Sequence, residues 1–488
     1  MTIPRPTAED MDERAEIDRA ARWPVLFFLT SAAAWLLVAS VLGFLSSLKL
    51  RVPDLVDEIG FLTYGRLFPM HLHALVYGWA MQAGFGVLLW MFSRLTRNPI
   101  SQPITLIVIG HVWNAAVSLS LLSILAGYGR SIPLLDFPKW IGVVILLAYA
   151  ATIVWVIPMF RARRDANIYV SEKYLIGAAV WFPWVFTAAN IFVNRETSPV
   201  MGAGVAAWYV SNLIYFWMVP MTLGMAYYLV PKIAARPLHS ASLANLSFWV
   251  LAFLAGWTGF SRFLGGPFPA WMTAVSAAAT VFILLAIVAA VGNLILTLKG
   301  VPNLWNYSPT LRFGLSGLLM LPIFAVLAAI SGTEFGARFL QFSHFVVGLD
   351  TLAVYGFFSM TLFGAIYFIV PRLTGCEWPS NNGIRTHFWW SVYGIITLVV
   401  TMLLGGIAQG TSLAQWDQAF STSTDMSSGA TIGRIIAWAF LTFANLRFLF
   451  QLGLMFIGKG RKTGGATMLH FEPGTATDSR AAATVGHH

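Results

Sequence analysis

Long apolar runs separated by short polar connections dominate this sequence. The run from Gln341 to Pro371 is about 31 residues long, whereas roughly 20 apolar residues suffice to cross a bilayer. Similar runs occur at residues 24–48, 68–95, 103–127, 138–160, 172–194, 202–231, 241–260, 268–298, 309–332, 340–371, 387–409 and 430–458. The pattern predicts an all-α, polytopic membrane protein with about twelve transmembrane helices.

The distribution of basic residues predicts the orientation of these helices. Of the 488 residues, 58% are hydrophobic and 10% charged, and the net charge is +10. About 20 Lys and Arg residues lie in the two terminal segments and the even-numbered loops, against about 9 in the opposite loops. This bias predicts cytoplasmic termini. It also explains the positive charge without a nucleic-acid partner.

We therefore expect three regions. Residues 1–22 form a cytoplasmic N-terminal segment, residues 23–460 form the twelve-helix membrane domain, and residues 461–488 form a disordered cytoplasmic tail. The connection at residues 410–429 is the longest on the outer side and is expected to be a loop.

An internal repeat relates three of the predicted helices. The segment GAIYFIVPR at 364–372 resembles GMAYYLVPK at 224–232, 140 residues earlier, and more faintly GVLLWMFSR at 86–94. The residues thirteen positions before the shared glycines are His73, Ser211 and Thr351, and those fifteen positions before them are His71, Tyr209 and Leu349. Only the first of the three helices carries histidines at this depth.

Several motifs support a resemblance to a known family. They include FPMHLHA at 68–74, YYLVPK at 227–232, WTGFSR at 257–262 and the long run HFVVGLDTLAVYGFFS at 344–359. Their order and spacing resemble those of the catalytic subunit of the C-family, cbb-type, haem-copper oxidases. The resemblance covers roughly residues 24–458. It implies a pseudo-threefold bundle of the kind formed by haem-copper oxidase subunit I.

The resemblance also implies where haem and copper ligands should stand, and most of them are missing. The histidine that binds the low-spin haem in the family matches His71, while its partner position holds Thr351 and the high-spin haem position holds Leu349. The three copper positions hold Ser211, Ser261 and Arg262, and the active-site tyrosine position holds Ala255. We therefore expect no copper, and either one haem b or no haem. The sequence has no CxxCH motif, so any haem would be held noncovalently.

Two further histidines are weaker candidates for cofactor binding. His73 lies about 200° around the helix from His71, so the two cannot bind one iron, and helix packing is its default role. His344 lies about 10 Å of helix before Thr351. It would complete a haem site only if the haem lay further outward.

Arg262 and Asp350 stand among the vacated ligand positions. A lone charge at this depth is costly, whereas a charge pair is tolerated. We expect the two side chains to approach each other and, with Trp257 and Phe260, to fill the space that cofactors occupy in relatives. In the alternative, Arg262 reaches water at the outer end of its helix.

These observations predict a subunit of a membrane redox complex in the bacterial inner membrane. It would no longer reduce oxygen, and would act as an anchor or scaffold or as a single-haem electron carrier among lipids and other subunits. The resemblance alone implies that these subunits include cytochrome c-type ones. Two alternatives stay open. One is an active oxidoreductase with atypical cofactor ligation, and the other is a bundle that conducts protons or a small solute.

Overall fold

The computed structural model describes residues 8–130, 132–164, 167–194, 198–301 and 308–461. Throughout these residues the chain is helical, apart from connections and one isolated β-bridge between Glu377 and Arg461. The elements of the first half are α1 (Ala8–Arg51), α2 (Tyr64–His73), η1 (Ala74–Met81), α3 (Gln82–Thr96), α4 (Pro103–Leu125), α5 (Lys139–Ile153), α6 (Val156–Arg161), α7 (Val170–Asn194), α8 (Pro199–Leu213), η2 (Ile214–Met218) and α9 (Val219–Ala234). Those of the second half are α10 (Ala241–Leu254), η3 (Ala255–Trp257), η4 (Phe260–Phe263), α11 (Ala270–Thr297), α13 (Pro309–Ser331), α14 (Glu334–Phe339), α15 (His344–Thr351), η5 (Leu352–Ser359), α16 (Met360–Thr374), α17 (Asn381–Leu413), α18 (Phe420–Met426) and α19 (Ser428–Phe456).

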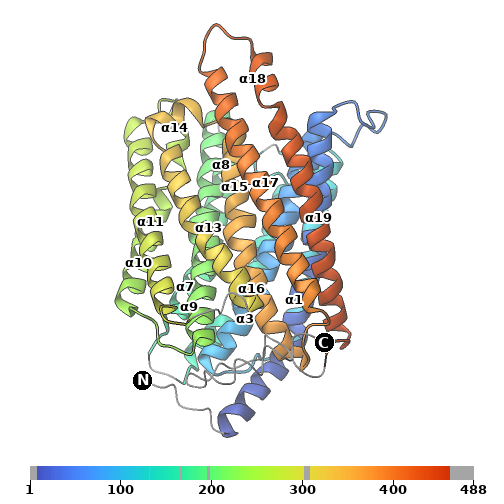
Figure 1. The fold of residues 1–488 in the computed structure, drawn as a ribbon, viewed down its shortest axis with the longest axis vertical. Coiled ribbons are helices and arrows are strands. Elements are labelled where there is room, and N and C mark those ends of the chain that lie inside the picture. Colours follow the sequence, from blue (N-terminus) through green and yellow to red (C-terminus); the bar gives the residue numbers. More distant parts are fainter. Residues whose placement is uncertain (1–7, 131, 165–166, 195–197, 302–307, 462–488) are drawn as a thin grey trace.

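Among the described residues, twelve helices are long and apolar enough to cross a membrane, which confirms the predicted fold class. They run roughly parallel to one long axis (Figure 1). The short helices α14 and α18 lie at one end, which we call the outer end because the basic residues predict that it faces away from the cytoplasm. The opposite end is called the inner end.

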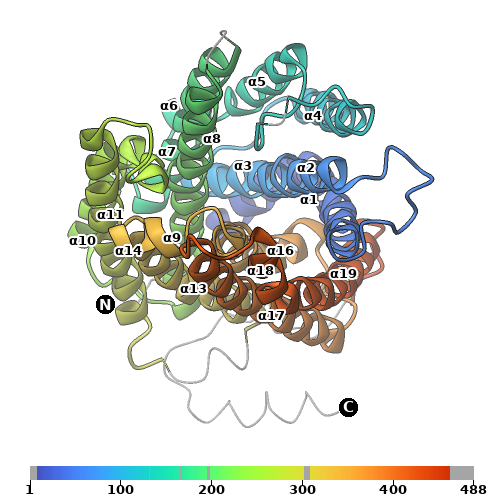
Figure 2. The ribbon, with the colours of Figure 1, turned by 90° about the horizontal axis from the view of Figure 1, so that it is seen from above.

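Three spans form the centre of the bundle. The most apolar windows of Tyr64–Thr96, Pro199–Ala234 and His344–Thr374 are 94–100% buried, against 39–50% for the other nine. Seen from above, α3, α9 and α16 lie toward the middle, with the remaining helices around them (Figure 2). These are the three helices that carry the sequence repeat, so the repeat marks the pseudo-threefold core.

The shared glycine of each repeat lies against the first helix of its own group of four. A Cβ atom added at Gly86 would lie 3.0 Å from Leu29 of α1, at Gly224 2.9 Å from Leu175 of α7, and at Gly364 2.7 Å from Thr310 of α13. Small residues permit such close contacts between membrane helices, where van der Waals packing replaces the hydrophobic effect as the driving force. The glycine shared by the three copies of the repeat therefore allows close contact between neighbouring helices.

Four residues after each glycine, the three central helices meet through aromatic rings. The ring centroids of Trp90, Tyr228 and Phe368 lie 6.0, 6.0 and 6.3 Å apart pairwise. Edge-to-face rings at this separation attract each other beyond the area they bury. The triad thus fixes the distances among the inner ends of α3, α9 and α16.

A layer of basic residues follows four positions later. Arg94, Lys232 and Arg372 each place their charge over the ring of their own helix, at 5.4, 5.5 and 3.5 Å from the centroid. Cation–π contacts partly offset the desolvation of these charges. Three like charges near one axis nevertheless require a counter-charge.

Asp18 of α1 supplies that counter-charge. Its carboxylate accepts hydrogen bonds from Trp90 Nε1 at 3.0 Å and Arg94 Nη1 at 3.1 Å, and it interacts electrostatically with Lys232 and Arg372. One acid from the first helix therefore joins all three repeats at the inner end.

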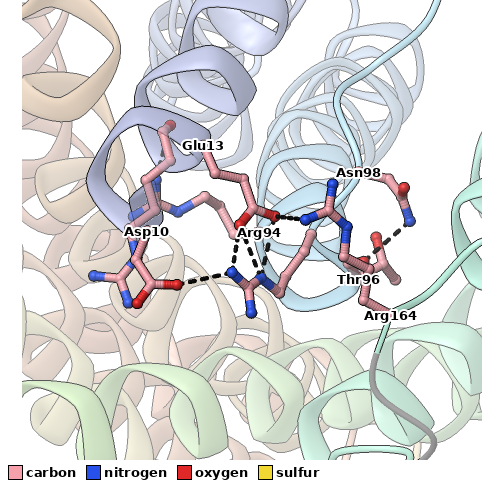
Figure 3. Close-up of polar contacts among 8 residues, drawn as sticks. Asp10, Glu13, Arg94, Thr96, Asn98 and Arg164 are labelled. Atoms are coloured by element: carbon pink, nitrogen blue, oxygen red, sulfur yellow. Dashed lines mark hydrogen bonds and ion pairs between the residues drawn. The ribbon is translucent and has the colours of Figure 1, made fainter. Parts of the chain in front are cut away.

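A second ionic cluster holds the start of α1 against the segments that directly follow α3 and α6 (Figure 3). Arg97 donates to Asp10 at 2.8 Å and to Glu13 at 3.1 Å, and Glu13 also pairs with Arg164 at 3.3 Å. Because α1 is one continuous helix from Ala8, the described part of the predicted N-terminal segment is not separated from the membrane domain at residue 22.

The structure differs from the sequence predictions in three local features. The fourth predicted helix is two pieces, α5 and α6, separated by a turn. The expected outer loop at 410–429 is largely helical, since α17 extends to Leu413 and α18 follows it. Of the predicted tail, Arg461 bridges to Glu377, and residues 462–488 lie outside the described part.

Replacing Asp18 tests the counter-charge directly. The change Asp18→Asn removes the negative charge that faces Arg94, Lys232 and Arg372, and we expect a loss of about 2 kcal/mol of unfolding free energy, the usual worth of charged hydrogen bonds. Denaturant titration of the purified protein in one fixed detergent measures it. Asp12→Asn, at an exposed position of the same helix, is the matched control and should leave stability unchanged. Equal stability of both variants would contradict the assignment.

Candidate functional site

The three central helices are π-helical at equivalent positions. The π-helical segments η1 and η5 begin directly after His73 and Thr351, and η2 begins three residues after Ser211. Counted from the shared glycines, η1 and η5 occupy the same eight positions, and η2 lies within them. A π-helical turn is rare and is frequent at functional sites. The π-helical geometry is therefore the same in the first and third of these helices and shorter in the second, whether or not a histidine precedes it.

One ring nitrogen of His71, on α2, is free to bind a ligand, and the other is held by a hydrogen bond. Its Nδ1 lies 2.7 Å from the carbonyl oxygen of Ala39, and the ring of Trp438 packs edge-on at 4.5 Å. A carbonyl only accepts, so Nδ1 carries the proton and Nε2 keeps its lone pair. In the described part of the chain Nε2 has no hydrogen-bond partner. His71 thus retains the ligand chemistry that the sequence predicts.

The positions opposite His71 hold no such ligand. Thr351 donates its hydroxyl to the carbonyl of Val347 at 2.8 Å. Leu349 is 4% exposed and belongs to the hydrophobic core. The threonine hydroxyl is engaged by its own helix, and the leucine has no donor atom.

The structure places His73 in a polar contact between helices. Its Nε2 lies 3.0 Å from Asp136, and its Nδ1 lies 2.9 Å from the hydroxyl of Ser120. Both ring nitrogens are engaged and the side chain is fully buried. This geometry leaves no lone pair for a cofactor and corresponds to the helix-packing role. His73 is therefore removed from the candidate ligands.

His344 begins α15 near the outer end and is half-buried. It is not among the residues that line the cavity described below. His344 and His71 both interact electrostatically with Arg434, and among the described residues no hydrogen bond or ring contact joins the two histidines.

The residues at the predicted copper positions form hydrogen bonds with other residues of the protein. Ser211 donates to Thr258 Oγ1 at 2.8 Å, and Thr258 donates to the carbonyl of Ala255 at 2.7 Å. The backbone nitrogen of Ser261 donates to Ser276 Oγ at 2.9 Å. These hydrogen bonds connect α8, the end of the seventh span and α11.

The seventh span departs from the predicted helix. The α-helical part, α10, ends at Leu254, and the 3₁₀ segments η3 and η4 follow. Gly259 between them has φ of 104°, and an added Cβ would lie 2.7 Å from the Cα atom of Trp208. Only glycine fits this turn.

This turn also corrects one sequence prediction. Trp257 is 52% exposed and points away from the core, and Phe260 contacts Phe268 instead of filling a central space. The two aromatic residues do not act as the expected filling.

Arg262 of η4 and Asp350 of α15 lie together. Arg262 Nη2 lies 2.8 Å from Asp350 Oδ1, and Nη1 lies 3.5 Å from Oδ2. Their side chains are 21% and 32% exposed, respectively. The pair joins a loop-like turn of the seventh span to the tenth span.

A cavity of about 790 Å³ lies at the outer half of the central helices. It reaches from His71 to the Arg262–Asp350 pair and includes Thr351. Its walls are mainly apolar and include Leu72, Leu75, Val76, Ala206, Ala207, Val210, Leu213, Ile214, Met218, Val346, Val347, Val354, Leu398 and Trp438. This size is within the range of about 300–1,000 Å³ typical of small-molecule sites.

Two more guanidinium groups line this cavity, and sequence reasoning missed both. Arg434 of α19 is 2% exposed, and Arg130 lies in the connection between α4 and α5. Burial lowers the pKa of Arg130 from its ordinary value, against the opposing charge of Asp136. Arg434 lies inside the last apolar run, and an arginine in such a run is itself a signal of a functional site.

A double-mutant cycle tests the Arg262–Asp350 pair. Arg262→Gln and Asp350→Asn should each destabilise the protein, because each leaves a charge unpaired inside the membrane domain. The double variant should lose less than the sum, with a coupling of about 1–3 kcal/mol in unfolding free energy.

The pair of Arg164 and Glu13, in which Arg164 lies at the surface, provides the control for this cycle. Arg164 is 62% exposed, and surface pairs couple by less than about 1 kcal/mol. Additive effects of Arg262→Gln and Asp350→Asn would show that the two side chains do not stabilise each other.

Comparisons with known proteins agree on one family. The sequence profile of Cytochrome C and Quinol oxidase polypeptide I matches residues 23–443. The Cbb3-type cytochrome c oxidase subunit CcoN1 of Stutzerimonas stutzeri is 24% identical over 392 residues, covering 78% of this chain and 82% of that protein. A cytochrome c oxidase subunit 1 homolog of Agrobacterium tumefaciens (strain T37) is 24% identical over 416 residues, covering 80% of this chain and 75% of that protein.

The fold is also similar to that of a solved oxidase. The cryo-EM structure of a heme-copper terminal oxidase dimer matches with a TM-score of 0.68 at 13% identity, covering 96% of this chain and 87% of that chain. At this identity the likeness concerns the fold alone. Together with the profile match over most of the chain, it confirms the predicted resemblance: this membrane protein belongs to the cytochrome c and quinol oxidase polypeptide I family.

Proposed function

We propose that this chain is a membrane subunit of a redox complex that has lost the oxygen-reducing haem-copper centre of its family and acts as an anchor or scaffold. One observation carries the proposal. The positions expected to bind copper and high-spin haem hold Ser211, Ser261, Arg262 and Leu349, and contacts within the protein engage all four residues.

The residues at the copper positions do not fit a copper ion. Copper in proteins is bound by imidazole or sulfur ligands, and an arginine guanidinium has no lone pair to offer. Arg262 would also bring a positive charge against the metal, and that charge is already paired with Asp350. Among the described residues, no group of three or more His, Cys, Asp or Glu side chains lies close enough to hold a metal ion.

The high-spin haem position fails for a simpler reason. Leu349 has only carbon atoms in its side chain and packs in the core at 4% exposure. Haem iron in proteins is held by His, Cys, Met or Tyr side chains. No step of oxygen reduction is therefore assigned to this chain.

A single haem beside His71 is the second candidate function, and the free Nε2 of His71 favours it. The Ala39 carbonyl fixes the tautomer that leaves this lone pair available. A haem bound there would supply one-electron transfer. Thr351, opposite, gives its hydroxyl to Val347, so the site offers one protein ligand where a six-coordinate haem needs two.

The proposed setting is a bacterial inner membrane, with both termini cytoplasmic. The similar proteins from Stutzerimonas stutzeri and Agrobacterium tumefaciens are bacterial oxidase subunits, which supports assembly with further membrane subunits.

A pyridine haemochrome assay with copper analysis on the purified protein tests the proposal. The scaffold function predicts less than one tenth of a haem or copper per chain. Reduced-minus-oxidised spectra of the same sample should show no haem band.

Two histidine variants separate the candidate functions. One haem b per chain that is lost in His71→Ala, but retained in His111→Ala at an exposed position of α4, would establish the single-haem carrier instead. Copper at one per chain together with oxygen consumption would overturn both.

A further inference from the structure

The cavity beside α19 contains an arginine with no acidic partner. Arg434 is 2% exposed, and its only described polar contact is a long one, 3.5 Å from Nη1 to the hydroxyl of Tyr64. Its guanidinium also lies over the rings of Tyr64 and Phe68, at 5.9 and 4.9 Å from their centroids. By contrast, Arg262 on the opposite wall has Asp350 as its partner.

One of the three guanidinium groups that line this cavity has no counter-charge among the described residues. Arg262 pairs with Asp350 and Arg130 interacts electrostatically with Asp136, whereas Arg434 faces no acid. In addition, Nη2 of Arg130 is buried without a hydrogen-bond partner. A buried charge without a counter-charge is costly. The cavity therefore favours an occupant that brings negative charge.

The rest of the lining is mainly apolar, so we expect the occupant to carry an apolar part as well as the negative charge. Beyond the arginines, the wall is formed mainly by aliphatic side chains of η1, α8, η2, α15 and η5. Phe342, which is 76% exposed, and Pro199 at the start of α8 also line the cavity. Since α8 begins and α15 is preceded by its connection at the outer end, the cavity is reached from the outer side of the bundle.

We propose that this cavity binds an anionic amphiphile of the membrane, with its carboxylate or phosphate at Arg434 and one acyl chain along the aliphatic wall. About 790 Å³ is sufficient for one acyl chain with its head group. A charged hydrogen bond from the guanidinium to an oxyanion is the strong kind, and a guanidinium at the apolar interface suits it better than an ammonium group. The proposal goes beyond the scaffold function but rests on it in one respect, because His71 and Thr351 line the same cavity and an amphiphile can occupy it only where no haem is bound.

The first measurement compares two ligands with the same chain. Displacement of a fluorescent fatty-acid probe from the purified protein should show oleate binding at least tenfold more tightly than oleyl alcohol, which lacks only the charge. Native mass spectrometry of the purified protein should find about one acidic amphiphile per chain. Its mass distinguishes a free fatty acid from an anionic phospholipid, and either result supports the proposal.

Variants then locate the head group and the chain. Arg434→Gln should weaken oleate binding at least tenfold and leave oleyl alcohol unchanged. Arg447→Gln, on the same helix and outside the cavity lining, is the matched control and should change neither. Ala207→Phe, which fills the cavity from α8, should weaken both ligands. If Arg434→Gln does not fold, two measurements still test the proposal. They are the comparison of oleate with oleyl alcohol and the effect of Ala207→Phe on both ligands.

Three outcomes would overturn the proposal. Equal binding of oleate and oleyl alcohol would remove the role of charge. Undiminished oleate binding in Arg434→Gln, with the protein folded, would mean that the amphiphile is ordinary surrounding lipid. One haem b per chain in place of any amphiphile would assign the cavity to the single-haem function.

Discussion

The contact among Trp90, Tyr228 and Phe368 is the interaction on which the rest of the bundle depends. A helix that is buried on every side has no polar face to orient it, so its position must come from packing. The aromatic triad sets the spacing of the three central helices at the inner end, and Asp18 offsets the charges that follow it. The other nine spans pack around this core, as Figure 2 shows.

None of these stabilising contacts uses a cofactor ligand. The glycines that meet α1, α7 and α13, the aromatic triad and the basic layer all lie toward the inner end from the vacated positions. The π-helical segments η1 and η5 occupy the same positions although His73 precedes one and Thr351 the other. These contacts therefore do not depend on the residues at the ligand positions, which supports the proposed loss of the haem-copper centre.

Sequence reasoning predicted the features that depend on length, period and repeat. Twelve spans followed from apolar runs, and the relation among three helices from the repeated GxxxxxxPR-like ending, because both properties are local to the chain. The central position of these three helices is seen only in the structure. The proximity of Arg262 and Asp350 was predicted from the resemblance, since both residues fall among vacated ligand positions.

Features that depend on three-dimensional packing were missed. The end of α10 at Leu254 arises from the turn at Gly259, which fits against the backbone of Trp208. The partners of His73, Ser120 and Asp136, lie 47 and 63 residues away, so no local pattern links them. Arg434 carried a readable signal as a charge in an apolar run, but its unpaired state appears only in the folded protein.

The central claim is that the family's fold persists here without its oxygen-reducing centre. A cryo-EM map of the protein purified from its own membrane tests it most directly. The account predicts side-chain density joining Arg262 to Asp350 and Ser211 to Thr258, with no metal peak between them. A planar density with a metal peak beside Leu349, or a second peak beside Ser211 and Ser261, would contradict it.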